Sequence, residues 1–67
     1  MRIDSNKVQL VMAEKQIRMM ELVRKTGLSH RSVKRILTTG GRPENCGKIA
    51  EALGVAVSEI IKNDDVA

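Results

Sequence analysis

The stretch TGLSHRSVKRIL, residues 26–37, carries apolar and basic side chains in one short segment. A helix beginning at Ser29 turns by about 100° per residue, which separates the two kinds. The apolar side chains share one arc of the helix: Val33, Ile36 and Leu37. The side chains that are basic or can become so share another arc, about 140° wide: His30, Arg31, Lys34 and Arg35. We therefore predict a helix over residues 29–37 with an apolar inner face and a basic outer face.

The residues on either side of Gly27 have the spacing of a helix-turn-helix. A glycine in a tight turn allows two short helices to meet at roughly 90–120°. Val23 lies four residues before this glycine, where the two helices would touch. Three apolar residues lie one, six and nine positions after it and would dock the second helix: Leu28, Val33 and Ile36. Ser29 is a suitable N-cap, and Leu28 and Val33 have the spacing of a hydrophobic staple.

The rest of the chain also reads as helical, because strand-type alternation is absent and Gly and Pro stand at punctuating positions. Asp4 or Ser5 can cap the first helix, and Pro43 suits the first turn of a fourth. The expected helical segments are residues 4–15, 18–25, 29–37, 43–53 and a short fifth one from about residue 58. Residues 63–67 are expected to be a disordered tail. The sequence thus predicts a single, compact all-α domain of five helices over residues 1–67.

The positive charge of the chain is concentrated in its middle third. The net charge is +4, but no acidic residue lies between Glu21 and Glu44. That window holds six basic residues: Arg24, Lys25, Arg31, Lys34, Arg35 and Arg42. A local basic patch suggests a polyanionic partner, most often nucleic acid, although an ordinary solvated face is the alternative. The chain has no aromatic residue, which argues against a stacking surface for single-stranded nucleic acid.

Two segments carry a resemblance to a known family. ELVRKTGLSHRSVKRIL and GGRPENCGKIAEALGVAVSEII resemble the Cro/C1-type helix-turn-helix regulators, or XRE family, over about Val8 to Ile61. The resemblance implies a lambda-repressor-like fold with its helix-turn-helix at the second and third helices. It also implies a sequence-specific regulator of transcription, expected to be a repressor, that inserts the helix at residues 29–37 into the major groove of double-stranded DNA.

The resemblance assigns roles to individual residues. The positions that commonly read bases in the family are here His30, Arg31, Lys34 and Arg35. The positions that approach the DNA backbone are here Arg18, Met19, Ser29, Thr38, Thr39 and Arg42. Arginine donates two parallel hydrogen bonds to guanine, so Arg31 or Arg35 is favoured as the specificity residue. Lys34 is favoured for a phosphate, and His30 can donate to either, with a protonation that would make binding pH-sensitive.

The chain departs from the family pattern just before the helix-turn-helix. Met19 stands where the family often has a glutamine that binds a phosphate, and Arg18 stands where a Ser or Thr cap is usual. Gln16 stands where a glycine is often found. The Arg18 side chain or the backbone N–H groups of the helix start would have to replace the missing phosphate contact.

Other function classes find little support in the sequence. The single cysteine, Cys46, excludes an internal disulfide, and with His30 it is too sparse a set for a metal site. No acid-base constellation appears, so we expect no enzyme activity and no cofactor. The longest apolar run is four residues, Leu10 to Ala13, so no membrane span is expected. We expect a cytoplasmic, nucleoid-associated protein of prokaryotic or phage type.

Two questions about partners stay open at this stage. The family resemblance implies a homodimer that reads a palindromic operator with half-sites about 34 Å apart. Candidate dimer residues are Ile60, Ile61 and Val66, although core packing is the alternative for the two isoleucines. A second possible function is a protein-interaction module, such as an antitoxin or antirepressor. An apolar patch of Leu10, Met19 and Met20 would motivate it.

Overall fold

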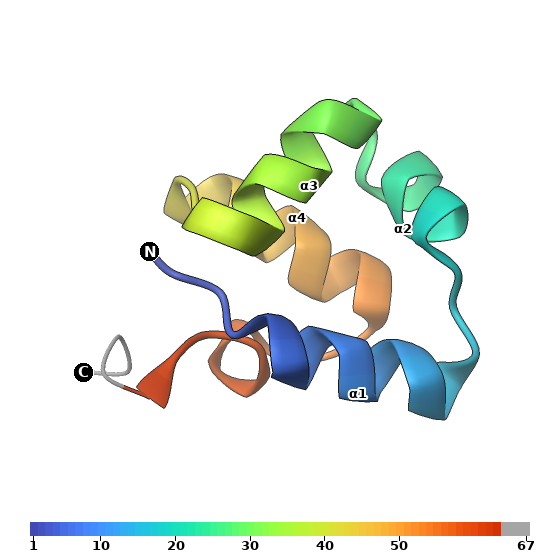
Figure 1. Cartoon of the computed structure of the whole chain (residues 1–67), viewed down its shortest axis with the longest axis horizontal. Coiled ribbons are helices and arrows are strands. Elements are labelled where there is room, and N and C mark those ends of the chain that lie inside the picture. The colour runs from blue at the N-terminus through green and yellow to red at the C-terminus, as the bar shows by residue number, and fades with distance from the viewer. Residues whose placement is uncertain (64–67) are drawn as a thin grey trace.

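A computed structural model describes residues 1–63 of the chain, and four α-helices and one turn of 3₁₀-helix organise them (Figure 1). The helices are α1 (Ser5–Lys15), α2 (Met19–Thr26), α3 (His30–Thr39) and α4 (Pro43–Leu53), followed by the 3₁₀ turn η1 (Val57–Glu59). The helix α4 contacts α1, α2, α3 and η1, so it lies at the centre of the packing. The expected all-α architecture is confirmed for these residues, and no described helix has the length and apolar character that a membrane crossing requires.

Short-range chemistry sets the ends of the helices. Asp4 caps α1, because its Oδ1 accepts hydrogen bonds from the backbone N–H groups of Asn6 (3.0 Å) and Lys7 (3.2 Å). Pro43 occupies the first turn of α4, where its missing N–H is not needed. Gly54 ends α4 with a φ of +73°, a left-handed conformation that glycine adopts without strain.

The prediction of a fifth helix is wrong. The last ordered element is the single 3₁₀ turn η1, and Ile60 and Ile61 follow it in extended or turn conformations. The N-terminal segment holds this part of the backbone: the N–H of Asp4 donates to the carbonyl of Ile60 at 2.8 Å, and Ile61 pairs with Ile3 in an antiparallel bridge. Because these pairings occupy the backbone after Glu59, a helix cannot continue through the two isoleucines.

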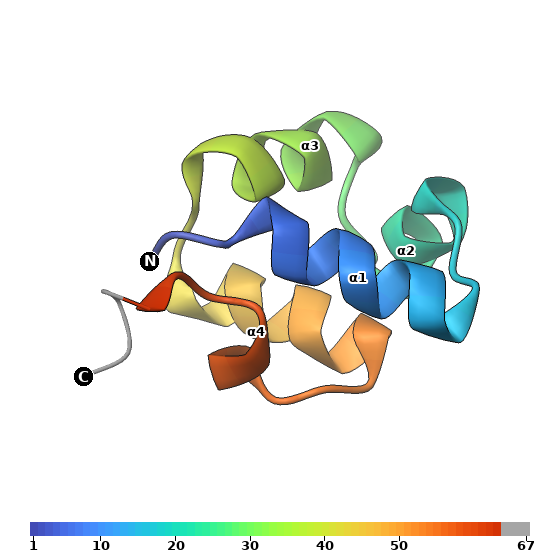
Figure 2. The ribbon, with the colours of Figure 1, turned by 60° about the horizontal axis from the view of Figure 1, so that its bottom comes forward.

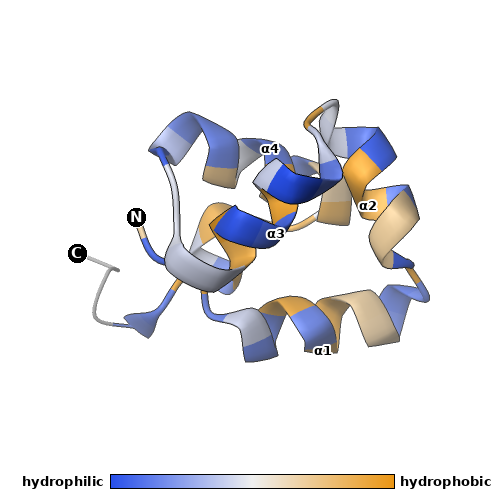
Figure 3. Ribbon diagram, turned by 45° about the horizontal axis from the view of Figure 1, so that its top comes forward, coloured by the Kyte–Doolittle hydropathy of each residue, from blue (hydrophilic) through white to orange (hydrophobic). Residues whose placement is uncertain are grey.

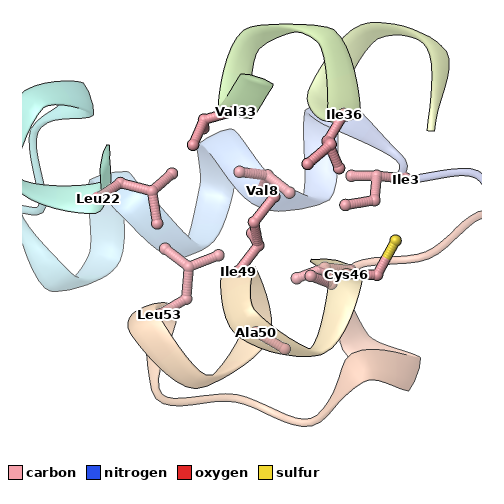
Figure 4. Packing of buried hydrophobic residues seen from close by; sticks show 10 residues of the cluster. Ile3, Val8, Leu22, Val33, Ile36, Cys46, Ile49, Ala50 and Leu53 are labelled. Atoms are coloured by element: carbon pink, nitrogen blue, oxygen red, sulfur yellow. The ribbon is translucent and has the colours of Figure 1, made fainter. Parts of the chain in front are cut away.

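The hydrophobic core draws at least one side chain from each helix (Figure 4). The side chains that are almost completely buried are Val8, Leu22, Val33, Cys46, Ile49, Leu53 and Ile60. Val11 and Met12 of α1 pack against this core while staying partly exposed. Leu10, which lies off the apolar stripe of its helix, keeps 63% of its surface exposed.

The N-terminal segment is a structural element that the sequence patterns did not indicate. Ile3 is 3% exposed and belongs to the core. The backbone N–H of Lys62 donates to the carbonyl of Arg2 at 3.1 Å, and that of Gly41 donates to the carbonyl of Met1 at 3.0 Å. This segment therefore ties the α3–α4 loop to the last described residues of the chain, and Figure 2 shows it between the two.

The two isoleucines proposed for a dimer patch do not form an exposed surface. Ile60 and Ile61 are 0% and 5% exposed within the single chain. They therefore pack in the core, which was the alternative to a place in a dimer interface. Val66 and most of the expected tail fall outside the described residues. An interface between two copies would have to use other side chains.

Candidate nucleic-acid interface

The turn between α2 and α3 is held by Thr26 together with Gly27. Gly27 adopts a φ of +74°, which allows the chain to leave α2 abruptly. The hydroxyl of Thr26 donates to the carbonyl of Val23 at 2.8 Å and accepts from the N–H of Leu28 at 3.2 Å. Thr26 is 8% exposed, so these bonds lie mostly out of water. The sequence analysis did not single out Thr26, although a threonine directly before a turn glycine is a signal that could have identified it.

Ser29 starts α3 as the sequence predicted. Its Oγ accepts a hydrogen bond from the backbone N–H of Ser32 at 3.1 Å and donates to the Ser32 hydroxyl at 2.9 Å. The two residues of the expected staple both contribute to the interior: Val33 is fully buried, and Leu28 packs against the core. The start of α3 is thereby fixed in position relative to α2.

The exposed side of α3 carries the four side chains that the helical wheel placed there. Val33 and Ile36 are buried. The four exposed residues are His30, Arg31, Lys34 and Arg35. Figure 3 shows this side of α3 as a hydrophilic stripe that faces away from the other helices. The predicted separation of an apolar inner face and a basic outer face is confirmed.

The four side chains do not share a single environment, which the wheel alone did not reveal. Arg35 lines a hollow of about 190 Å³ towards α4, together with Ser32, Arg42 and Asn45. Lys34 borders a groove on the opposite flank, between α3 and α1. At about 100° per residue, Arg31 points almost directly away from the buried Val33 and Ile36, whereas Lys34 and Arg35 are turned by about 50° to opposite sides of it. The central line of the face therefore belongs to Arg31, with Lys34 on the flank towards α1 and Arg35 on the flank towards α4.

Thr38 and Thr39 lie in the last turn of α3 and not in the following loop. The helix extends two residues beyond the predicted end at Leu37. The hydroxyls of Thr38 and Thr39 donate to the carbonyls of Lys34 (2.8 Å) and Arg35 (2.9 Å), four residues earlier. These bonds satisfy the threonines inside a helix and occupy their hydroxyl protons. Both side chains are exposed, but as hydrogen-bond acceptors more than as donors.

The hollow beside α4 gathers polar groups from two elements. Arg42 is the exposed N-cap residue of α4 and makes no side-chain capping bond. Ser32 and Asn45 line the hollow with it, and neither was named as a candidate from the sequence. Ser32 follows the cap residue Ser29 by three positions, and Asn45 is the third residue of α4, so only the packing of α3 against α4 brings them together. The result is a polar hollow with two guanidinium groups at its edge.

The start of α2 shows what replaces the usual cap. Arg18 is the N-cap residue, is exposed, and makes no side-chain capping bond. Met19 is turned inward, packs against the core and lines the groove between α1 and α3. Met19 therefore contributes no polar side chain here, and only the backbone N–H groups and the Arg18 side chain are available to an anion.

The exposed cations of α3 are not neutralised by neighbouring carboxylates in the described part of the chain. The ion pair found within residues 1–63 joins Lys25 to Glu21 at 3.7 Å, one turn apart on α2. Arg31, Lys34 and Arg35 have no such partner among those residues. A surface of this kind attracts a polyanion through uncompensated charge.

Comparison with known proteins agrees with this geometry. A model of the Cro/C1-type helix-turn-helix DNA-binding domain matches residues 7–65, which is most of the chain. The chain belongs to the Cro/C1-type helix-turn-helix family. The resemblance noted in its sequence is thus confirmed, and the exposed basic helix of this Cro/C1-type domain is the second helix of the motif.

One solved structure shares the fold. It is a mutant of hydroxyethylphosphonate dioxygenase, with a TM-score of 0.78 and 27% sequence identity. The match covers 94% of this Cro/C1-type domain and 14% of the dioxygenase chain, so the domain spans about one seventh of that enzyme's length. No curated protein matches the chain.

Proposed function

We propose that this Cro/C1-type domain is a sequence-specific regulator of transcription that acts by binding double-stranded DNA and not by catalysis. Repression is the simplest mode, because a bound domain blocks access to its operator. The observation that carries the proposal is the exposed basic face of α3, which buried Val33 and Ile36 hold outward and which no carboxylate within residues 1–63 neutralises. An α-helix of this kind fits the major groove of B-form DNA.

We assign base reading chiefly to Arg31 and Arg35. Arg31 lies on the central line of the exposed face and Arg35 lies beside it, and a guanidinium can donate two parallel bonds to guanine O6 and N7. Lys34 lies on the flank towards α1, where a phosphate of the groove wall would be closer than a base edge. His30 stands in the first turn of α3 and can donate to a base or a phosphate.

The hollow between α3 and α4 fits a DNA phosphate on the other flank. Arg42 supplies charge there, and the Ser32 hydroxyl and Asn45 amide can donate hydrogen bonds. On the flank towards α1, Arg18 and the uncapped N–H groups at the start of α2 offer a second anion position. Ser29 is already engaged in capping α3, so its role is to fix the helix more than to contact the backbone.

We further propose that the domain acts as a homodimer on a palindromic operator, in the cytoplasm of a prokaryotic or phage-infected cell. A two-fold dimer presents two copies of α3 to half-sites about one helical turn apart, which raises specificity because both half-sites must match. Ile60 and Ile61 are excluded from the interface because they are buried in each chain.

Selection of bound sequences from a pool of random duplexes tests the proposal directly. We expect the bound pool to converge on one motif with two inverted halves. Affinity for the selected duplex should fall as salt rises, because phosphate contacts release counterions. A pool that stays random would contradict specific regulation, and an affinity that does not change with salt would contradict DNA binding.

A protein-interaction module is the second candidate, and two exposed apolar side chains favour it. Leu10 and Met20 are 63% and 71% exposed, although Met19, the third residue of the expected patch, is turned towards the core. A stoichiometric protein partner whose binding is lost with Leu10→Ser and retained with Arg31→Ala would support this function. If Arg31→Ala abolishes binding of the partner and Leu10→Ser does not, the partner is held through DNA and not through direct contact with the domain.

A further inference from the structure

A groove of about 370 Å³ lies between α1 and α3. We call it the α1–α3 groove. Its floor is apolar and is formed by Val8, Met12, Met19 and Leu37. Its volume lies within the range of pockets that hold small molecules, about 300–1,000 Å³. Because Met12 and Met19 are unbranched and adaptable, the floor can adjust its shape to an apolar guest.

The rim of the α1–α3 groove is polar and positively charged. Lys34 and Lys62 line it together with the hydroxyls of Ser5 and Thr38. None of the described lining residues is acidic, and neither ammonium group has an ion pair or a hydrogen bond within residues 1–63. An apolar floor with a positive rim that no carboxylate within residues 1–63 neutralises is complementary to a molecule that joins an apolar body to an anionic head.

The two ends of the groove differ in character. The helices α1 and α3 run in opposite directions across it, as Figure 1 shows, so Ser5 faces the end of α3 at Thr38. Lys62 joins them at this polar end, whereas Met12 and Met19 belong to the apolar end. Seven residues of helix separate Ser5 from Met12, so the groove is about 10 Å long. That length suits a short aliphatic chain lying along α1.

We propose that the α1–α3 groove binds a small amphipathic anion, an aliphatic carboxylate with its chain on the apolar floor and its head beside Lys62. The carboxylate accepts hydrogen bonds from the Lys62 ammonium and from the hydroxyl of Ser5. The chain covers Met12, Met19 and Leu37, which are partly exposed, and so removes apolar surface from water. Lys34 adds a second positive charge along the same rim.

Occupancy of this groove would weaken DNA binding, a consequence that rests on the proposed function. Lys34 and Thr38 line the groove and also belong to the DNA-facing helix α3. A bound anion places negative charge beside Lys34 and so opposes the approach of a phosphate. The domain would then release its operator when the carboxylate is abundant.

Decanoate is the probe for the first experiment, which is performed without DNA on methyl-labelled protein by NMR. We expect saturable shifts of the Val8, Met12 and Leu37 methyl signals. The methyl signals of Leu10 and Met20, both exposed and outside the groove, should not move. Acetate, which lacks the chain, and decyltrimethylammonium, which reverses the charge of the head, should bind much more weakly. Equal shifts at Leu10 and Met20, or equal binding of the cation, would overturn the proposal.

A matched pair of charge reversals locates the head group. Lys62→Glu should weaken decanoate binding about fivefold, the factor that one exposed charge contact can supply. Lys48→Glu makes the same change at an exposed position of α4 that does not line the groove, and it should have little effect. Equal effects of the two variants would contradict a head at Lys62. Lys62→Gln should give a smaller loss in the same direction and replaces the glutamate variant if that one fails to fold.

A measurement of DNA affinity with and without decanoate distinguishes the proposed carboxylate site from the proposed DNA-binding function. We expect decanoate to lower the affinity of the wild-type domain for its selected duplex, and to do so less with Lys62→Glu. Decanoate shifts without any DNA binding would contradict the proposed function and leave the carboxylate site standing. DNA binding that saturating decanoate does not change would contradict the coupling between the two.

Discussion

At the residue scale, Gln16 occupies a conformation that its side chain does not favour. It ends α1 with a φ of +56°, and no other non-glycine residue among the described ones has a positive φ. For an L-residue this left-handed conformation costs roughly 1–2 kcal/mol. The sequence analysis noted only that glycine is often found at this position in the family, and the backbone supplies the physical reason for that preference.

Gln16→Gly should therefore stabilise the domain. We expect the free energy of unfolding to rise by about 0.5–1 kcal/mol, because relief of the strain exceeds the entropy that glycine adds to the unfolded chain. Gln16→Ala keeps the strain and should change stability by less than about 0.5 kcal/mol. Far-UV circular dichroism during denaturation is the suitable measurement, since the chain has no aromatic fluorophore. Equal stabilisation by alanine would show that the backbone conformation is not the cause.

Thr26 offers a second residue-scale prediction. Thr26→Val keeps the shape of the side chain but removes the bonds to the carbonyl of Val23 and from the N–H of Leu28. Because the site is nearly buried, we expect a loss of about 1–3 kcal/mol in the free energy of unfolding. Thr38→Val removes one exposed hydroxyl bond of α3 and should cost less than about 0.5 kcal/mol. A comparable loss in both variants would contradict the role given to the turn.

At the element scale, the α3–α4 loop depends on a close approach of the N-terminal segment. Gly40 has a φ of +90°, and a Cβ placed there would collide with the carbonyl oxygen of Met1. Apart from its chain neighbours and the backbone of its own helix, Gly47 in α4 has no heavy atom within 4 Å of the position where a Cβ would stand. The close approach therefore requires a glycine at position 40, whereas no neighbouring side chain or segment requires one at position 47.

Alanine substitutions at these two glycines should change the free energy of unfolding in opposite directions. Gly40→Ala should lower the free energy of unfolding by about 1–3 kcal/mol through strain and the collision with the N-terminal segment. Gly47→Ala should raise it by about 0.5–1 kcal/mol, because alanine is the better helix former. Thermal unfolding of the two variants side by side provides the comparison. Destabilisation by Gly47→Ala would mean that α4 packs more tightly there than the structure indicates.

Much of the element order follows from local signals in the sequence. Gly27, Ser29, Pro43 and Gly54 fix helix ends through interactions that reach only a few residues along the chain, so sequence patterns find them. The sequence prediction ended α3 at Leu37 and missed its last two residues, Thr38 and Thr39. Their hydroxyls donate to backbone carbonyls one turn earlier, which allows both residues to remain in the helix.

The parts of the fold and site that sequence patterns missed depend on contacts between distant segments. The pairing of Ile3 with Ile61 joins the two ends of the described chain, and it explains both the buried isoleucines and the lost fifth helix. The exposed face of α3 was predictable from helical periodicity. Its two different flanks were not, because Ser32 and Asn45 meet only when α3 packs on α4.

At the scale of the whole molecule, one helix organises the surface that we assign to DNA. The helix α4 contacts α1, α2 and α3. The orientation of α3 is therefore fixed by the packing of its buried face against the core that these helices share. On either side of α3 lies a hollow, one polar towards α4 and one partly apolar towards α1. The molecule thus presents a basic ridge between two recesses.

The central claim is that Arg31 on this ridge reads a base while Lys34 holds the backbone. The most direct test compares the wild-type domain with Arg31→Ala and Lys34→Ala on the selected duplex and on a scrambled one, with Lys48→Ala as the surface control. Arg31→Ala should cost about 1–3 kcal/mol on the selected duplex and relax one base preference, with a much smaller effect on the scrambled duplex. Lys34→Ala should weaken both complexes alike. The slope of log affinity against log salt concentration should fall by the amount expected for about one lost phosphate contact. If Arg31→Ala weakens both duplexes equally, or leaves both unchanged as Lys48→Ala should, base reading by α3 is contradicted.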